Sequence, residues 1–147
     1  MIAFAARVWR LAAAATSPTA PAASPEGRFH HSGQAALYTP LTPEGAAIAI
    51  RRYMSADDPP RRLYPLSVNA GRIADMRGDR SLSVVWQDMR ATGAPAPTWA
   101  ISDRLRAAGA QGLLYSSRSR PDLGHLVLFG DFDRIIRADG PGAAWPG

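Results

Sequence analysis

The chain of 147 residues contains no cysteine, and arginine provides its permanent positive charge because lysine is also absent. Without cysteine, the protein can form no disulfide bond, use no thiolate nucleophile and offer no cysteine ligand to a metal. No run of residues is apolar for long enough to cross a bilayer. The segment Met1–Ala15 has the small apolar residues of a signal peptide, but Arg7 and Arg10 interrupt it. We therefore expect a soluble cytoplasmic protein that makes no membrane contact.

The positive charge comes from 17 arginines set against 12 acidic residues, which gives a net charge of +5. The planar guanidinium group pairs with phosphate or carboxylate through two parallel hydrogen bonds, which favours an anionic ligand or an acidic partner. A GC-rich genome would also enrich arginine together with alanine, glycine and proline, so the composition leaves both explanations open. No basic stripe with interleaved aromatic residues and no helix-turn-helix pattern is present, so we expect no direct contact with nucleic acid.

The length of the chain and its 46% hydrophobic and 20% charged residues are typical of one globular domain. We predict a single domain over residues 1–147, with a flexible Gly- and Pro-rich tail at 138–147. Strands and helices do not alternate regularly, which favours an α+β fold with a sheet core over a doubly wound parallel sheet. Pro65 indicates an edge strand or a bulge. Strands are predicted at Arg7–Leu11, Ala35–Thr39, Arg62–Val68 with a continuation at Ile73–Met76, Gly112–Tyr115, His125–Phe129 and Ile135–Arg137.

Helix-start and helix-stop signals occur between these strands. Each predicted helix begins with a hydroxyl residue that can cap its first turn, and each has apolar residues at helical spacing. The loop at Ala12–Glu26 has no usable period and could cover a site. Helices are predicted over Pro43 to about Met54 after the N-cap Thr42, from a Ser81 cap through Arg90, and from a Thr98 cap to about Ala108 with Gly109 at the C′ position.

Two loop segments concentrate groups that could bind an anion, namely residues 27–33 (GRFHHSG) and 115–120 (YSSRSR). Each places arginine among small or hydroxyl residues beside a predicted strand, where N–H and O–H groups can converge on phosphate oxygens. No Walker loop, GxGxxG, HExxH or GxSxG motif is present. His30 and His31 are adjacent and point in different directions, and His125 begins a core strand, so we assign catalysis and metal binding to none of them.

These segments, together with LY at 37–38, TPEGA at 42–46 and LLYSSRSRPDLGHLVLF at 113–129, resemble the RES domain, which is named for its Arg, Glu and Ser. The likeness covers nearly the whole chain. It implies an ADP-ribosyltransferase-like mixed sheet flanked by helices, with NAD as the substrate and no metal. Members of the family cleave NAD by hydrolysis or phosphorolysis, or modify a protein, and many are toxins held by an Xre-family antitoxin.

The resemblance also implies which residues form the site. Arg28 matches the arginine of the family's GR motif, Tyr38 matches the tyrosine that follows, and Ser117 matches the serine of a Pro-Ser pair in which Ser116 replaces the proline. Arg28, Tyr38 and Ser117 are therefore the expected catalytic and NAD-binding residues, and Arg118 is a further NAD-binding candidate. From the residues alone, Arg28 could equally form a surface ion pair, Tyr38 a core contact and Ser117 a turn.

The family's glutamate is missing. It belongs eleven residues after the tyrosine, and Ala49 occupies that position here. Glu44 is the nearest acid, but it lies more than one helical turn earlier and should face elsewhere, at the helix N-terminus. The resemblance implies an enzyme that cleaves the nicotinamide–ribose bond of NAD. The alternatives are a protein ADP-ribosyltransferase and a degenerate RES domain that binds NAD or an antitoxin without turnover.

Overall fold

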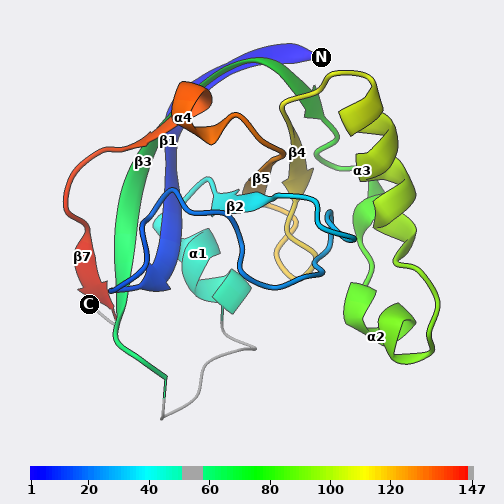
Figure 1. The fold of residues 1–147 in the computed structure, drawn as a ribbon, viewed down its shortest axis with the longest axis horizontal. Coiled ribbons are helices and arrows are strands. Elements are labelled where there is room, and N and C mark those ends of the chain that lie inside the picture. Colours follow the sequence, from blue (N-terminus) through cyan, green and yellow to red (C-terminus); the bar gives the residue numbers. More distant parts are fainter. Residues whose placement is uncertain (51–57, 146–147) are drawn as a thin grey trace.

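Seven strands form one mixed sheet in the computed structural model, which describes residues 1–50 and 58–145 (Figure 1). The principal strand order is β1-β3-β4-β5-β2, and β6 and β7 pair with β3. The pair β3–β4 is parallel, and the other pairs are antiparallel. The predicted α+β sheet core with flanking helices is confirmed. The strands are β1 (Ile2–Ala13), β2 (Leu37–Pro40), β3 (Arg61–Asp75), β4 (Gly112–Ser116), β5 (Gly124–Leu128), β6 (Ile136–Ala138) and β7 (Ala143–Trp145).

The long strand β3 is central to the sheet, because it pairs with β1 along most of its length and with β4 at its C-terminal end. Pro65 lies inside this paired strand, opposite Trp9, so the edge alternative was wrong. The bulge alternative fits the other side of β3, where residues 139–142 of the break between β6 and β7 lie opposite Tyr64 and Pro65. The carbonyl of Pro65 accepts a hydrogen bond from the Asp139 N–H at 3.0 Å. The N and C=O of a strand residue point to the same side, so the missing N–H of Pro65 faces residues 139–142, between β6 and β7, where no ladder bond is lost.

Helix α1 (Pro43–Ile50) begins where the sequence predicts, with Thr42 Oγ1 accepting a hydrogen bond from the Gly45 N–H at 3.0 Å. The predicted continuation to Met54 lies outside the described residues. Helix α3 (Pro97–Ala107) ends as predicted, with Gly109 at a φ of 83°. The short helix α4 (Phe132–Ile135) precedes β6.

The predicted helix from Ser81 to Arg90 was wrong. The structure has a 3₁₀ turn, η2 (Arg80–Leu82), and a separate helix, α2 (Trp86–Ala91). Asp79 rather than Ser81 caps the turn, because its carboxylate accepts a hydrogen bond from the Ser81 N–H. Val85 is extended between the two elements, as suits a β-branched residue, and this divides the segment.

The ends of the described chain are held by β3. The segment predicted as a tail contains β7, which pairs with Arg61–Leu63. Arg62 donates hydrogen bonds to the carbonyls of Pro141 and Gly142. Gly142 has a φ of 74°, and a Cβ there would lie 2.9 Å from the Leu63 carbonyl oxygen, so glycine lets the chain pass close to β3. A Gly- and Pro-rich composition can thus form an edge strand when its backbone groups find partners in a neighbouring strand.

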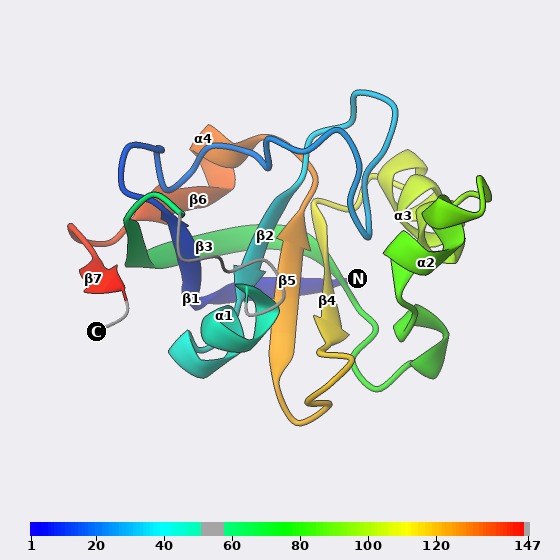
Figure 2. The ribbon, with the colours of Figure 1, turned by 90° about the horizontal axis from the view of Figure 1, so that it is seen from below.

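The side chains of β4 and β5 alternate between two buried clusters, one on each face of the sheet. Helices α2 and α3 lie at one end of the molecule and β7 at the other (Figures 1 and 2). No described helix has the length and apolar character needed to span a membrane. The cluster beneath α3 includes Phe29, Leu113, Tyr115 and Val127, and the cluster on the other face includes Leu66, Leu114, Leu126 and Leu128.

Candidate active site

A cleft of about 670 Å³ lies between the loop that follows β1, helix α1, the residues before α2 and the loop that follows β4. Arg28, Tyr38, Ser117 and Arg118, the residues predicted for the site, all line it. They come from segments that are far apart in sequence, and the sheet order brings these segments together because β2 and β4 both pair with β5. The structure therefore places the whole predicted set around one cavity.

Arg28 carries a positive charge into this cleft without an ion-pair partner among the described residues. Its guanidinium carbon lies 4.9 Å from the centre of the Tyr115 ring, and Nη2 donates a hydrogen bond to the Leu82 carbonyl. Its Nε is buried and has no hydrogen-bond partner among the described residues. Burial lowers the pKa of Arg28 from its ordinary value, but a guanidinium group stays charged in proteins. Within residues 1–50 and 58–145 Arg28 therefore forms no surface ion pair, and it has hydrogen-bonding capacity left for an anion.

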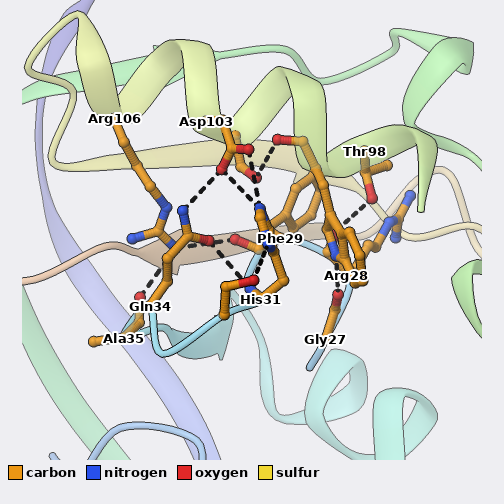
Figure 3. A network of polar contacts seen from close by, with 12 residues as sticks. Gly27, Arg28, Phe29, His31, Gln34, Ala35, Thr98, Asp103 and Arg106 are labelled. Carbon is orange, nitrogen blue, oxygen red and sulfur yellow. Dashed lines mark hydrogen bonds and ion pairs between the residues drawn. The ribbon is translucent and has the colours of Figure 1, made fainter. Parts of the chain in front are cut away.

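The backbone around Arg28 is held by side chains of α3 (Figure 3). Thr98 Oγ1 donates to the Arg28 carbonyl, and Trp99 Nε1 donates to the Gly27 carbonyl at 2.8 Å. Thr98 is therefore not the N-cap that the sequence predicts, and Ala96 holds that position without a side-chain bond. These bonds fix the direction in which Arg28 leaves the loop.

The second half of the same loop is also attached to α3. Arg106 donates to the carbonyls of Phe29 and Ala35, each at 3.0 Å. Asp103 accepts from Gln34 Nε2 at 2.8 Å and lies 3.0 Å from His31 Nε2 (Figure 3). Charge-assisted bonds of this kind are stronger than bonds between neutral groups. Together these bonds attach residues 27–35 to α3, so α3 fixes the conformation of this loop.

Tyr38 belongs to a partly buried network of hydrogen bonds whose proton positions can be assigned. His30 Nε2 lies 2.9 Å from the Ser24 carbonyl, which can only accept, so Nε2 carries a hydrogen. In the neutral imidazole Nδ1 is then an acceptor, and the Tyr38 hydroxyl, 2.7 Å away, donates to it. The same hydroxyl oxygen accepts from the Phe29 N–H at 3.0 Å. Burial raises the pKa of Tyr38 well above its ordinary value, which keeps the phenol protonated.

Gly27 leaves the space that the hydrogen bonds between Tyr38 and His30 require. A Cβ at this position would lie 2.6 Å from His30 Nδ1 and 2.7 Å from the Tyr38 hydroxyl oxygen. Both are side chains held in place by further bonds, so neither can move aside at low cost. The glycine of the GR pair is thus required for close packing against His30 and Tyr38.

Ser117 and Arg118 follow β4 at the other side of the cleft. Ser117 is buried, and its Oγ accepts from the Arg120 N–H at 3.3 Å, while no described residue accepts the hydroxyl hydrogen. Arg118 is exposed and forms no ion pair within residues 1–50 and 58–145. Arg118 and Arg28 both line the cleft, and the charge of Arg118 adds to the effect of burial in lowering the pKa of Arg28. A hydroxyl donor and paired positive charges suit a ligand with phosphate and sugar groups.

Several further residues line the cleft that the sequence did not indicate, and His125 is the clearest of them. It is buried, stacks on Tyr115 with ring centres 5.4 Å apart, and lies near Arg28. Burial, reinforced by the charge of Arg28, lowers the pKa of His125 to about 4, so its imidazole is neutral at pH 7. The sequence placed His125 in a core strand, but only the pairing of β5 with β4 brings it beside Tyr115.

Ala49 lines the cleft, so the position of the family's glutamate faces the site without a carboxylate. Glu44 does not replace it. Its side chain is 60% exposed, forms an ion pair with Arg120 at 3.0 Å and does not line the cleft. Glu26, by contrast, does line the cleft and pairs with Arg90 at 3.1 Å. The described residues contain no cluster of three or more histidine and acidic side chains that could hold a metal ion.

Fold and site together define a mixed-sheet domain with an arginine, a tyrosine and a serine converging on one cleft. The model of the RES domain family matches residues 6–146, and the chain belongs to this family. Its structure is similar to a chain in the crystal structure of the M. tuberculosis MbcT–MbcA toxin–antitoxin complex, with a TM-score of 0.63 and 16% sequence identity. The match covers 95% of this chain and 87% of that chain. No curated protein matches the sequence.

Proposed function

We propose that this RES domain degrades NAD by cleaving the bond between nicotinamide and ribose, and that it acts as the toxin of a cytoplasmic toxin–antitoxin pair. The observation that carries the proposal is the convergence of Arg28, Tyr38, Ser117 and Arg118 on one cleft, with Arg28 lacking a carboxylate partner among the described residues. Membership of the RES family supports NAD as the substrate. The similarity to a chain of a toxin–antitoxin complex supports a protein partner, which we propose is an Xre-family antitoxin.

The reaction breaks one bond and forms one. The C1′–N bond breaks, its electron pair goes to the positively charged pyridinium nitrogen, and nicotinamide leaves as a neutral molecule that needs no general acid. The ribosyl C1′ becomes cationic in the transition state, as in glycoside cleavage generally. Water then adds to C1′ and releases a proton to give ADP-ribose, or inorganic phosphate adds to the same carbon, which is numbered 1″ in the product, to give ADP-ribose 1″-phosphate.

The residues of the cleft bind and orient NAD for this step. We assign the diphosphate to Arg28, with Arg118 as a second positive charge, because guanidinium groups pair with phosphate oxygens. The free hydrogen of the Ser117 hydroxyl can donate to the ribose or to the nicotinamide amide. Holding the sugar and the diphosphate in one orientation lowers the entropic part of the barrier.

Tyr38 has a narrower role than its residue type suggests. Its hydroxyl hydrogen is directed to His30, and its oxygen already accepts from the Phe29 N–H. A hydroxyl oxygen has two lone pairs, so one remains that can accept a hydrogen bond from a ribose hydroxyl. We therefore assign Tyr38 to ring stacking and to accepting from the ribose, and not to proton donation.

A second candidate function is binding without turnover. The observation that favours it is Ala49, because a cationic transition state is stabilised by a nearby carboxylate and the cleft has none at this position. Intact NAD bound in calorimetry, with no nicotinamide released, would support this second function. Transfer of label from NAD to a protein band in a lysate would instead support ADP-ribosylation.

The proposal can be tested in cells by inducing the native chain and two arginine variants at equal protein levels. Arg28→Ala removes the cleft cation that we assign to the diphosphate, whereas Arg137→Ala removes an exposed arginine of β6 that does not line the cleft. We expect the native chain and R137A to lower cellular NAD and stop growth, and R28A to do neither. Unchanged NAD after induction of the native chain, or equal toxicity of R28A, would contradict the proposal.

A further inference from the structure

The cleft contains a carboxylate that the family's motif does not assign. Glu26 is the one acidic residue among the described residues that line it, and its side chain is 35% exposed. The other charged residues of the lining are Arg10, Arg28 and Arg118, so the cleft is otherwise cationic. Resting on the proposed function, we infer that Glu26 supplies the negative charge that Ala49 does not provide.

The position of the Glu26 carboxylate is set by Arg90 of α2, which packs against the start of α3. Arg90 Nε donates to Glu26 Oε1 at 3.1 Å, and Arg90 Nη1 is itself held by the Ala94 carbonyl at 2.9 Å. The Arg90 guanidinium carbon lies 5.1 Å from the centre of the Trp99 ring, and Trp99 Nε1 binds the carbonyl of Gly27, the next residue after Glu26. Trp99 therefore contacts both the Arg90 side chain that pairs with Glu26 and the backbone of the residue that follows Glu26.

One oxygen of this carboxylate remains available. Oε1 accepts from Arg90, whereas no described residue donates a hydrogen bond to Oε2. An anchored carboxylate with a free oxygen, exposed to a cleft, can face a positive charge without first breaking its own ion pair. Glu44 lacks this arrangement, because it lies outside the cleft and pairs with an exposed arginine.

The chemistry of the reaction calls for such a group. Arginines stabilise the diphosphate, but they repel the pyridinium ring of NAD⁺ in the ground state and the ribosyl cation in the transition state. Preorganised charge of the opposite sign is among the largest contributions to catalysis. Glu26 thus stabilises the positive charge that moves from the pyridinium ring to C1′ as the bond breaks, and nicotinamide leaves with the electron pair.

Two readouts follow from this role. The first is turnover: Glu26→Gln keeps an oxygen that can accept from Arg90 but removes the charge, and we expect nicotinamide release to fall about 100-fold. The second is ligand preference in calorimetry, since the native chain should bind NAD⁺ more tightly than NADH, whose nicotinamide ring is neutral. We expect E26Q to lose this preference. Glu44→Gln, the matched control outside the cleft, should leave both readouts within about twofold of the native values, since exposed ion pairs contribute little.

Restoring a carboxylate at the family's position completes the test. We expect Ala49→Glu in the E26Q background to recover turnover, with thermal unfolding recorded for each variant. If E26Q does not fold, Glu26→Asp replaces it as the test, because it keeps the negative charge but moves it back by one methylene group. We expect turnover about tenfold slower than in the native chain and an unchanged preference for NAD⁺, because the stabilising carboxylate is then misplaced.

E26Q or E26D as active as the native chain would overturn the role of Glu26 while leaving the proposed function intact. A silent native chain with an active A49E variant would also overturn it. Silence of both the native chain and A49E would contradict the proposed function itself.

Discussion

The hydroxyl oxygen of Tyr38 lies 2.7 Å from Nδ1 of His30, and the Ser24 carbonyl on the other side of the imidazole determines which of these atoms holds the proton. The hydroxyl donates to His30 and accepts from the Phe29 N–H. This relationship ties a side chain of β2 to the loop that carries Arg28. Tyr38, for which the sequence left open a substrate contact or a core contact, therefore also fixes the geometry of its neighbours.

Tyr38→Phe should destabilise the protein even without any ligand. The substitution leaves the Phe29 N–H without its acceptor and His30 Nδ1 without its donor, and unsatisfied buried groups cost about 1–3 kcal/mol of the free energy of unfolding. Urea denaturation would measure the change. Tyr64→Phe is the control, because the Tyr64 hydroxyl has no hydrogen bond to a described residue and is not one of the buried unpartnered polar atoms. Equal effects of the two substitutions would contradict the structural role of Tyr38.

Gly27→Ala should disrupt the same hydrogen bonds of Tyr38 and His30 by steric overlap. Its Cβ would lie 2.7 Å from the Tyr38 hydroxyl oxygen, so His30 and Tyr38 must separate, and overpacking of this kind costs about 1–3 kcal/mol. Thermal unfolding and tyrosine hydroxyl exchange would both report it. Gly130→Ala is the matched control, because a Cβ there meets nothing within 4 Å. A G27A variant as stable as G130A would show that the loop can move aside.

Because His125 is buried and neutral, we expect the free energy of unfolding to decrease in mild acid. The pKa of His125 in the folded protein, about 4, lies below its ordinary value of 6.5, so the unfolded state binds more protons between these pH values. The neutral, buried His125 therefore makes its full contribution to the free energy of unfolding above pH 6.5. This contribution, about 3 kcal/mol, is lost as the pH falls to about 4. His125→Gln cannot be protonated, so its free energy of unfolding should fall less over the same range. Parallel pH profiles for the native chain and H125Q would refute this assignment.

Arg106→Met should loosen the loop that bears Arg28. The substitution removes the donors to the carbonyls of Phe29 and Ala35 while keeping an unbranched apolar side chain against Phe129, whose ring centre lies 4.3 Å from the Arg106 guanidinium carbon. We expect faster amide hydrogen exchange in residues 27–36 and a lower unfolding midpoint, since backbone carbonyls lose their partners. Arg104→Met, an exposed position on the same helix, should leave the exchange of this loop unchanged. Identical hydrogen exchange of residues 27–36 in R104M and R106M would contradict the role of α3 in holding this loop.

Local signals in the sequence predicted part of the fold well. The strand patterns at residues 112–115 and 125–129 and the glycine stop at Gly109 depend on nearest neighbours, and the structure contains β4, β5 and the end of α3 there. Thr98 shows where local reasoning fails. Its hydroxyl binds the Arg28 carbonyl, a partner 70 residues away in sequence, and no pattern within a helix can indicate such a bond.

The candidate site was predictable only in part for the same reason. Family resemblance identified Arg28, Tyr38 and Ser117, whose motifs are visible as short segments. Glu26 and His125 carry no such signal, because their approach to the cleft depends on the β4–β5 pairing and on Arg90 and Trp99. The resemblance to the RES domain implied a carboxylate at the position of Ala49, but only the structure showed that another carboxylate, Glu26, lines the cleft.

The most direct test of the central claim is the release of nicotinamide from NAD by the purified chain, with and without inorganic phosphate, beside R28A and A49E. We predict release by the native chain and none by R28A, and dependence on phosphate would distinguish phosphorolysis from hydrolysis. No release by either the native chain or A49E, in the presence or absence of phosphate, would contradict the claim that this cleft cleaves NAD.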